Sequence, residues 1–255
     1  MEAQRGTRTA IVTGAGSDRG IGRAAAIRLA KDGWALGLLD IQGDAVAALA
    51  EELTALHGVP AAGLAVDVGD EHAVRAVVTE LEKTLPPLGG LANIAGVSSP
   101  DAYLELDSAE WSRVLRINLD GVHYISRRVA ESLAKAGSGR IVSISSVSAQ
   151  RGGGTFSKAP YSVSKAGVIG LTRALARELG PYGITVNAIA PGPIDTDIMG
   201  GTLSEERKAA MVEELLVNRV GTTDDIASAI SFLLGPESGY ITGQTLNVDG
   251  GLYMH

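Results

Sequence analysis

Tyr161 and Lys165 are the two side chains of this sequence best placed to exchange a proton. They enclose the segment Tyr-Ser-Val-Ser-Lys, and in a helix this spacing puts both side chains on one face. A phenol with a pKa near 10 is a poor acid or base at neutral pH, but a neighbouring ammonium group favours the phenolate and lowers that pKa. The pair therefore predicts that Tyr161 is a general acid/base. In an arbitrary helix it would be an exposed tyrosine beside a surface lysine, so the prediction depends on its surroundings.

A glycine-rich turn near the N-terminus has the composition of a phosphate-binding loop. Thr13 is followed by Gly-Ala-Gly-Ser-Asp-Arg-Gly-Ile-Gly at positions 14–22. Glycines let the backbone approach a pyrophosphate, whose charge is met by free amides at a helix N-terminus. Asp40 follows 20 residues after Gly20, where an acid can hydrogen-bond the ribose hydroxyls of a dinucleotide. Either signal alone is weak, but together they indicate a dinucleotide site.

The residues around Asp40 favour NAD over NADP. A carboxylate repels a 2′-phosphate, and the next residue is Ile41 rather than the arginine that suits NADP. Arg19, and less directly Arg23, argue the other way, because a basic residue in the glycine loop can reach a 2′-phosphate. We predict NAD as the cofactor and keep NADP as the alternative.

The elements that must position these residues alternate between strand and helix. Seven short apolar runs predict strands at Thr9–Thr13, Trp34–Asp40, Ala61–Val66, Leu91–Ile94, Arg140–Ser145, Ile184–Ile189 and Thr245–Val248. Amphipathic stretches predict helices at Ile21–Lys31, Ala45–Leu56, Glu71–Leu85, Ala109–Lys135, Ser162–Leu179 and Asp224–Leu234. This order predicts one α/β domain over residues 1–255, with a Rossmann-like, doubly wound parallel sheet of seven strands and helices on both faces. Ligands of such sheets bind beyond the carboxyl ends of the strands.

Composition excludes several other classes of function. A net charge of −7 and 4% aromatic residues argue against a nucleic-acid surface. The chain has no cysteine, and its four histidines lack metal-ligand spacing, so we expect no metal site. No apolar run reaches the roughly 18 residues of a membrane span. We expect a cytoplasmic protein that acts on a small molecule, without a membrane or nucleic-acid partner.

Further motifs occur in an order that resembles one family. Asn93-Ile94-Ala95-Gly96 follows the fourth predicted strand, Asn118 lies in a long helix, Ser145-Ser146 follows the fifth strand, and Pro191-Gly192-Pro193-Ile194-Asp195-Thr196 follows the sixth. With the glycine turn and the Tyr–Lys pair, they resemble the short-chain dehydrogenase/reductase family over practically the whole chain. Asp40 matches the acid of its NAD-dependent members.

The resemblance implies a role for each catalytic residue. Tyr161 would exchange a proton with the substrate oxygen while hydride passes between the carbinol carbon and nicotinamide C4. Lys165 would lower the pKa of Tyr161 and hold the nicotinamide ribose. Ser146, rather than Ser145, would hydrogen-bond the substrate oxygen, and Asn118 would help a water-linked proton relay.

The same resemblance implies a set of cofactor contacts. The adenine would meet Asp67 and Val68, Asn93 and Gly96 would border the adenosine ribose, and the carboxamide and phosphates would meet Ile194 and Thr196. The full predicted set comprises Gly14, Ser17, Gly20, Ile21, Asp40, Asp67, Val68, Asn93, Gly96, Tyr161, Lys165, Pro191, Gly192, Ile194 and Thr196.

Two departures from the family pattern stand out. Five residues rather than three separate Gly14 from Gly20, so the glycine loop is two residues longer. This loop spacing resembles that of divergent enoyl reductases, but those separate tyrosine and lysine by six residues, and here three intervene, which argues against enoyl reduction. The motif Asn-Ile-Ala-Gly lacks the family's second asparagine.

The predicted activity is NAD(H)-dependent interconversion of a secondary alcohol and a ketone. The alternatives are a 3-oxoacyl-thioester reductase that uses NADP(H) and a non-catalytic dinucleotide sensor. Substrate choice is expected in the variable loops 97–106, 150–160 and 197–217, the last resembling a lid hinged on Gly200-Gly201. The family resemblance also implies a homotetramer built partly on helices 109–135 and 162–179.

Overall fold

The sheet has the topology that the sequence predicts. The structure is a computed structural model that describes residues 7–154, 157–199 and 201–254. Its strands pair in parallel in the order β3-β2-β1-β4-β5-β6-β7. They are β1 (Thr9–Thr13), β2 (Ala35–Asp40), β3 (Ala61–Ala65), β4 (Leu88–Asn93), β5 (Gly139–Ile144), β6 (Ile184–Pro191) and β7 (Thr245–Val248). The predicted doubly wound, Rossmann-like α/β fold is confirmed.

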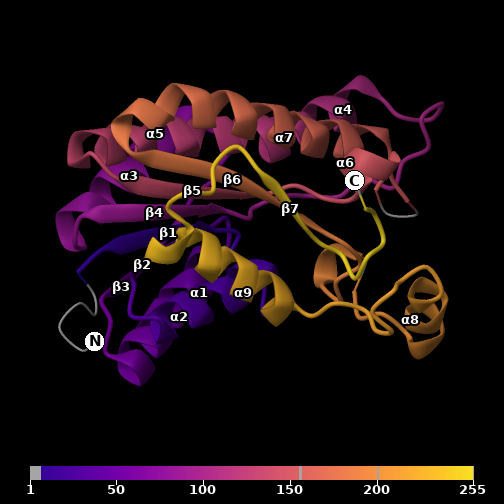
Figure 1. Cartoon of the computed structure of the whole chain (residues 1–255), viewed down its shortest axis with the longest axis horizontal. Helices are drawn as coiled ribbons and strands as arrows, with labels where there is room; N and C mark the ends of the chain where they lie inside the picture. The colour runs from indigo at the N-terminus through magenta and orange to yellow at the C-terminus, as the bar shows by residue number, and fades with distance from the viewer. Residues whose placement is uncertain (1–6, 155–156, 200, 255) are drawn as a thin grey trace.

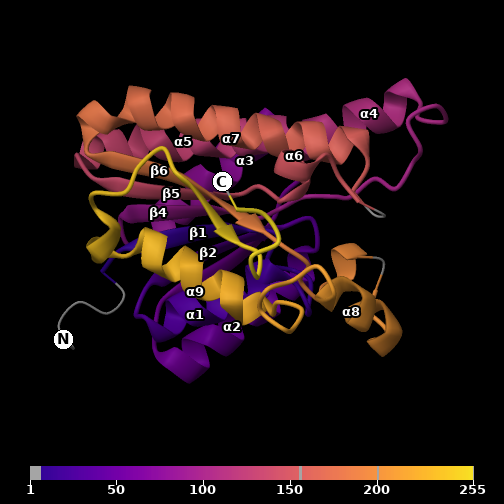
Figure 2. The same cartoon turned by 45° about the vertical axis from the view of Figure 1, so that its right-hand side comes forward.

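Helices cover both faces of the sheet (Figures 1 and 2). One layer holds α1 (Ile21–Lys31), α2 (Gly43–His57) and α9 (Thr223–Leu234). The other holds α3 (Glu71–Thr84), α4 (Ser108–Leu115), η2 (Arg116–Asp120), α5 (Gly121–Ala136) and α7 (Ala159–Leu179). The short helices are α6 (Ser148–Arg151), η3 (Gly180–Tyr182), η4 (Asp197–Met199), α8 (Glu205–Val212) and η5 (Pro236–Ser238). No helix in the part of the chain that the structure describes is both long and apolar enough to cross a membrane.

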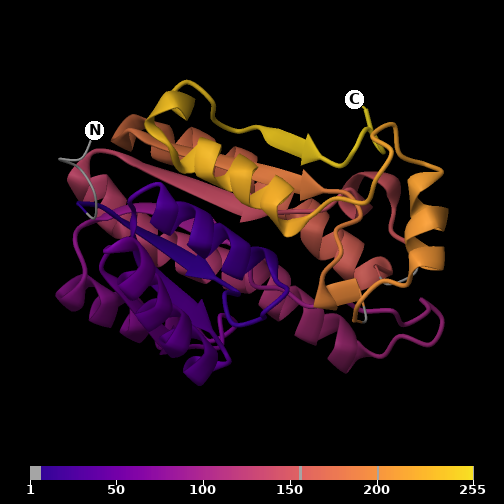
Figure 3. The ribbon, with the colours of Figure 1, turned by 90° about the horizontal axis from the view of Figure 1, so that it is seen from below.

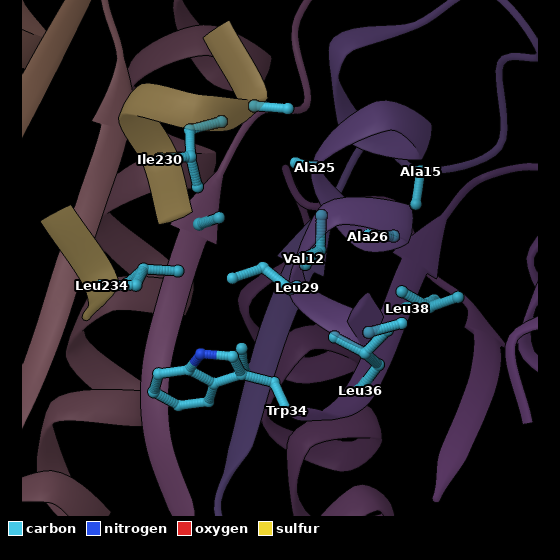
Figure 4. Packing of buried hydrophobic residues seen from close by; sticks show 14 of the residues in the cluster. Val12, Ala15, Ala25, Ala26, Leu29, Trp34, Leu36, Leu38, Ile230 and Leu234 are labelled. Carbon is cyan, nitrogen blue, oxygen red and sulfur yellow. The ribbon is translucent and has the colours of Figure 1, made fainter. Parts of the chain in front are cut away.

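The core consists of two apolar layers separated by the sheet. Side chains alternate between the faces along each strand, so Val12 packs with α1 and α9 while its neighbour Ile11 packs with α3 and α5. Figure 4 shows the first layer, where Leu29 of α1 and Ile230 of α9 meet side chains of β1 and β2. Because both faces are buried, the strands read as continuous apolar runs. The two layers fix the sheet, and the sheet positions the loops at its carboxyl end.

One predicted helix is wrong in detail. The sequence predicts a single helix from Ala109 to Lys135, whereas the structure divides it into α4, the π-helical turn η2 and α5. A π-turn inserts one residue into the hydrogen-bond register of a helix, and such turns are common at functional sites. Asn118 lies in this turn and is fully buried.

The carboxyl ends of the strands meet the segment between β6 and α9. In Figure 3 the arrowheads of the last two strands point toward the end of the molecule where α8 stands. Helix α8 lies within the predicted lid region 197–217. Gly200, one of the two predicted hinge glycines, lies outside the described residues, and Gly201 has φ +104°.

Candidate active site

Tyr161, Lys165 and Ser146 converge where β5 meets α7. Tyr161 and Lys165 lie in the first two turns of α7 and are 8% and 3% exposed. The Lys165 Nζ lies 5.7 Å from the centre of the Tyr161 ring and donates a hydrogen bond to the Ile144 carbonyl at 2.8 Å. Ser146 follows β5 and shares a hydrogen bond with the Tyr161 side chain. Ser145 instead donates to the Lys165 carbonyl at 2.8 Å, so the structure brings Ser146, rather than Ser145, to the phenol.

Burial controls the protonation of this group of residues. It raises the pKa of Tyr161, and the hydrogen bond from Ser146 opposes it only in part. Burial also lowers the pKa of Lys165 to about 8. In the protein alone, desolvation of the phenolate therefore outweighs the Ser146 hydrogen bond, and a lowering of the Tyr161 pKa by Lys165 stays a prediction. Tyr161 is a protonated phenol at neutral pH, the form that can donate a proton.

Asn118 fastens the loop after β4 to the π-turn. Its Oδ1 accepts from the Val97 amide at 2.8 Å, and its Nδ2 donates to the Val97 carbonyl at 2.9 Å and to the Ser164 Oγ at 3.1 Å. A Cβ at Gly96 would lie 3.2 Å from Asn118 Oδ1 and 3.5 Å from Lys165 Nζ. Asn118, in the π-turn, thus holds the loop whose Gly96 lies close to Lys165.

The glycine loop has the shape that a pyrophosphate requires. Gly14 has φ +72°, and a Cβ on Gly22 would lie 2.1 Å from the Gly14 carbonyl oxygen, so α1 can start against the loop only with glycine there. The N-cap of α1 is Gly20, with no side-chain cap and no acidic residue in the first turn. The first amides of α1 therefore lack a side-chain acceptor and suit an anionic ligand. The residues present fit a dinucleotide.

Asp40 closes the far side of the glycine loop. Its carboxylate accepts hydrogen bonds from the Gly16 amide at 2.9 Å and the Gln42 amide at 3.0 Å. Asp40 ends β2 and is only partly buried. The carboxylate is thus held beside the loop, at the position where an adenosine ribose would meet it.

The glycine loop contacts the segment that follows β6. Arg19 forms an ion pair with Asp195, donates to the hydroxyl of Thr202, and lies 3.6 Å from Asp197. Ser17 adds a hydrogen bond from its Oγ to Asp197 Oδ2 at 3.0 Å. We call this group, Ser17 and Arg19 with Asp195, Asp197 and Thr202, the glycine-loop bridge. It joins the loop after β1 to the segment after β6.

A cavity of about 510 Å³ connects the nucleotide end to the Tyr–Lys pair. Among the residues predicted from the sequence, it is lined by Ile21, Gly96, Ser146, Tyr161, Lys165, Pro191, Gly192, Ile194 and Thr196. The turn after β6 is held against β7, because Gly192 donates to the Val248 carbonyl at 3.1 Å and a Cβ on Gly192 would lie 2.7 Å from the Asp249 Cα. The cavity therefore runs from the start of α1 to Tyr161.

The geometry agrees with comparisons to known proteins. A family model described as enoyl-(acyl carrier protein) reductase matches residues 14–253. An uncharacterized short-chain type dehydrogenase/reductase, y4mP of Sinorhizobium fredii, is 39% identical over 248 residues, 97% of this chain and 98% of the relative. The chain belongs to the short-chain dehydrogenase/reductase family.

Other relatives of this dehydrogenase/reductase carry more specific names. The 3-oxoacyl-[acyl-carrier-protein] reductase FabG of Aquifex aeolicus is 35% identical over 253 residues, 99% of this chain and 100% of the relative. The acetoacetyl-CoA reductase of Allochromatium vinosum is 37% identical over 249 residues, 97% of this chain and 99% of the relative. These relatives support oxidoreduction with a nicotinamide dinucleotide.

Two of the predicted cofactor residues of this dehydrogenase/reductase have other partners in the structure. Asn93 is 2% exposed and its Nδ2 donates to the hydroxyls of Ser126 at 2.9 Å and Ser143 at 3.1 Å, so its side chain ties β4 to α5 and β5. Asp67 accepts from the Gly69 amide at 2.9 Å and pairs with Arg116 at 2.9 Å. The contact of Asn93 with the adenosine ribose stays a prediction, and its side-chain amide nitrogen serves to join β4 to its neighbours.

Sequence reasoning missed the charged residues at the substrate end of the dehydrogenase/reductase cavity. Arg151, Arg207 and Glu214 line it together with Met211 and Ser98. Ser98 and Arg151 come from two variable segments, and the other three residues come from a third, so only the tertiary structure brings the segments together. The only sequence signal was that these segments fall in the loops expected to choose the substrate.

Proposed function

We propose that this protein interconverts a secondary alcohol and a ketone with NAD(H), using Tyr161 as the general acid/base. The observation that carries the proposal is one cavity lined by Ser146, Tyr161 and Lys165 that also reaches the start of α1. When bound, the dinucleotide would supply or accept the hydride at nicotinamide C4. Gly14, Gly20, Ile21, Ile194 and Thr196 would hold it.

The side chains of the site donate the proton, bind the substrate oxygen and hold the loop beside Lys165. The Tyr161 phenol donates its proton to the ketone oxygen as that oxygen gains negative charge, and Ser146 steadies the same oxygen by a hydrogen bond. Lys165, with a pKa of about 8, is mostly protonated at neutral pH and holds positive charge near the phenol. Asn118 keeps the loop beside Lys165 in place, and a proton relay through it remains part of the proposal.

The preference for NAD rests on charge around the adenosine ribose. Asp40 places a carboxylate beside the glycine loop, where it would repel a 2′-phosphate. The two arginines that could favour NADP already pair with acids: Arg19 with Asp195, and Arg23 with Glu52 at 2.8 Å. Both guanidinium groups would have to leave a carboxylate to meet a 2′-phosphate.

A second candidate is reduction of a 3-oxoacyl thioester with NADPH. The names of the Aquifex and Allochromatium relatives favour it, since each covers nearly the whole chain. It uses the same proton donor and the same cavity, so the two candidates differ in substrate and cofactor rather than in chemistry.

Steady-state assays with simple ketones, acetoacetyl-CoA and both reduced cofactors test the proposal. Tyr161→Phe should lower kcat by about 10²- to 10⁴-fold while NADH affinity, measured by fluorescence, is largely retained. Tyr182→Phe, at an exposed tyrosine, is the matched control and should keep wild-type activity. A fully active Tyr161→Phe protein would refute the role of Tyr161, whereas NADH binding without any turnover would favour a dinucleotide sensor.

Cofactor choice is tested separately with Asp40→Ala. Removing the carboxylate should lower the ratio of NAD to NADP affinity by at least tenfold, because the repulsion of a 2′-phosphate is lost. Titrating wild type and variant with both cofactors measures this ratio. An unchanged ratio would remove Asp40 from the assignment.

We also propose a homotetramer, with the outer faces of α5 and α7 as contact surfaces. Large apolar side chains are also exposed in the C-terminal part of the described structure, at Phe232 of α9, at Tyr240 and at Leu246 of β7. Surfaces of this kind are typical of subunit contacts. Light scattering measures the assembly directly, and a monomer at micromolar concentration would refute it.

A further inference from the structure

The turn after β3 packs closely against the π-turn η2 and the start of α5. A Cβ on Gly121, the first residue of α5, would lie 2.9 Å from Val68 Cγ2 and 3.2 Å from the Val68 carbonyl oxygen. A Cβ on Gly69 would clash with the Arg116 side chain, lying 2.8 Å from its Cζ. The two glycines therefore allow this approach, and the guanidinium group of Arg116, the first residue of η2, lies over the backbone of the turn.

Arg116 holds the carboxylate of Asp67 in one orientation. The Oδ1 of Asp67 accepts from the Gly69 amide at 2.9 Å, and its Oδ2 accepts from Arg116 Nη1 at 2.9 Å. Burial raises the pKa of Asp67, but these hydrogen bonds and the charge of Arg116 outweigh it and keep that pKa below its usual value. A carboxylate has about four acceptor positions, and the side chain of Asp67 is 39% exposed. Each oxygen can therefore still accept from a ligand.

Asp67 lies next to the position expected for the adenosine ribose. Strand β3 pairs with β2, and the Val66 amide donates to the Asp40 carbonyl at 2.8 Å, so the turn after β3 begins beside Asp40. On the other side of Asp40 is the glycine loop, which has the shape for the pyrophosphate. A base attached to a ribose at Asp40 would thus extend over the turn after β3, where Asp67 presents a charged acceptor.

The π-turn fixes the position from which Arg116 reaches Asp67. Asn118 of the same turn is fully buried and bonds to both Val97 backbone groups and to Ser164. Residues two positions apart point to different sides of a helix, so Arg116 can reach the loop after β3 while Asn118 holds the loop after β4. One turn therefore supports both the predicted adenine end and the Tyr–Lys end of the site.

We propose that Arg116 is a positioning residue for the adenine of the cofactor, because it holds the Asp67 carboxylate where it accepts a hydrogen bond from the adenine amino group. The proposal rests on the proposed function, since it concerns the same dinucleotide. The exocyclic amino group of adenine is a donor, whereas hypoxanthine carries an oxygen at that position. A carboxylate held in place therefore selects against hypoxanthine, because two acceptors would face each other.

Binding of two fluorescent dinucleotides tests the proposal. NADH and reduced nicotinamide hypoxanthine dinucleotide carry the same nicotinamide and differ only in the base. The wild type should bind NADH more tightly by about tenfold or more, as expected for a hydrogen bond to a charged group. Arg116→Gln should reduce this preference by about fivefold, because the Gly69 amide alone then holds Asp67, and Arg116→Lys should keep part of it. If NADPH binds better than NADH, NADPH and its hypoxanthine analogue replace the pair.

Arg75→Gln is the matched control. Arg75 pairs with Glu131 at 3.0 Å, and the two side chains are 45% and 40% exposed, compared with 43% and 39% for Arg116 and Asp67. This variant removes an ion pair of similar exposure between α3 and α5 and should keep the wild-type preference. A wild type without a preference, or equal preferences in Arg116→Gln and wild type, would overturn the proposal. An equal loss of affinity for both dinucleotides in Arg116→Gln would show that Arg116 supports only the fold.

Asp67→Ala distinguishes positioning from direct contact with the base. It should remove most of the preference by itself, and adding Arg116→Gln should then change the remainder less than about twofold, because Arg116 acts through Asp67. If the second substitution lowers the preference as much as it does in the wild type, Arg116 acts on the base itself and its positioning role is refuted.

The outcomes separate this inference from the proposed function, because the readout is binding. If NADH binds with the expected preference but no ketone is reduced, the proposed function fails and the role of Arg116 stands. If ketones are reduced but Arg116→Gln keeps the wild-type preference, the activity stands and the role of Arg116 is refuted. If neither NADH nor NADPH binds, both are refuted.

Discussion

Replacing Lys165 with methionine should stabilise the folded protein at neutral pH while it removes the activity. Lys165 is 3% exposed, and burial lowers its pKa from 10.5 to about 8. This difference corresponds to roughly 3 kcal/mol of unfavourable free energy for keeping the ammonium charged in the folded protein. Methionine has a similar length and carries no charge, so it avoids this cost.

The pH dependence of the stability difference between wild type and Lys165→Met shows whether the buried charge causes it. Between pH 8 and 10.5 the unfolded chain still binds the proton that folded Lys165 has released, so the stability of the wild type rises with pH in this window. Below pH 8 the cost is present in full. The stability gain of Lys165→Met should therefore be smaller at pH 10 than at pH 7 by about 2 to 3 kcal/mol. The variant also loses the hydrogen bond to the Ile144 carbonyl, a cost of about 1 kcal/mol that is similar at both pH values.

Urea unfolding followed by circular dichroism at pH 7 and pH 10 measures both differences. Lys31→Met is the control, because it removes an exposed ammonium group from the last turn of α1 and leaves the buried one in place. If the stability gain of Lys165→Met were equal at pH 7 and pH 10, burial of the charged Lys165 ammonium would not destabilise the folded protein.

Three other substitutions test the glycine loop and the N-terminus of α9. Gly22→Ala should weaken NADH binding at least tenfold, because its Cβ would lie 2.1 Å from a backbone oxygen of the glycine loop; unchanged affinity in a fluorescence titration would contradict this loop shape. Arg19→Ala should speed NADH release about fivefold in stopped-flow fluorescence, since a partly exposed ion pair with Asp195 contributes up to about 1 kcal/mol; equal rates would show that the bridge does not retain the cofactor. Hydrogen bonds from Arg219 lower the pKa of Asp225, which also completes the capping box of α9. Asp225→Asn should cost about 1 kcal/mol at pH 7, and in urea unfolding this cost should shrink as the pH falls below about 4; a constant cost would exclude the ion pair as its cause.

The order of strands and the catalytic pair could be predicted because each leaves a local pattern. Buried parallel strands read as apolar runs, and the Tyr161–Lys165 spacing fixes a shared helix face. The start of β4 was placed three residues late, at Leu91 instead of Leu88, because Gly89 and Gly90 interrupt the apolar run. The π-turn at Asn118 was missed because a shift of hydrogen-bond register leaves no change in apolar periodicity.

The features that could not be predicted depend on contacts between distant segments. The raised pKa of Tyr161 follows from burial by residues far along the chain, and no local spacing reports that burial. The Arg151–Glu214 ion pair joins residues 63 positions apart. The sequence suggests a 2′-phosphate as a partner of Arg19, but its partner in the structure, Asp195, lies 176 positions away.

The glycine-loop bridge makes access to the nucleotide site sensitive to ionic strength. Its ion pair joins side chains that are about a quarter to a third exposed, so dissolved ions reach and screen it. Added salt should therefore loosen the attachment between the β1 loop and the segment that leads to α8.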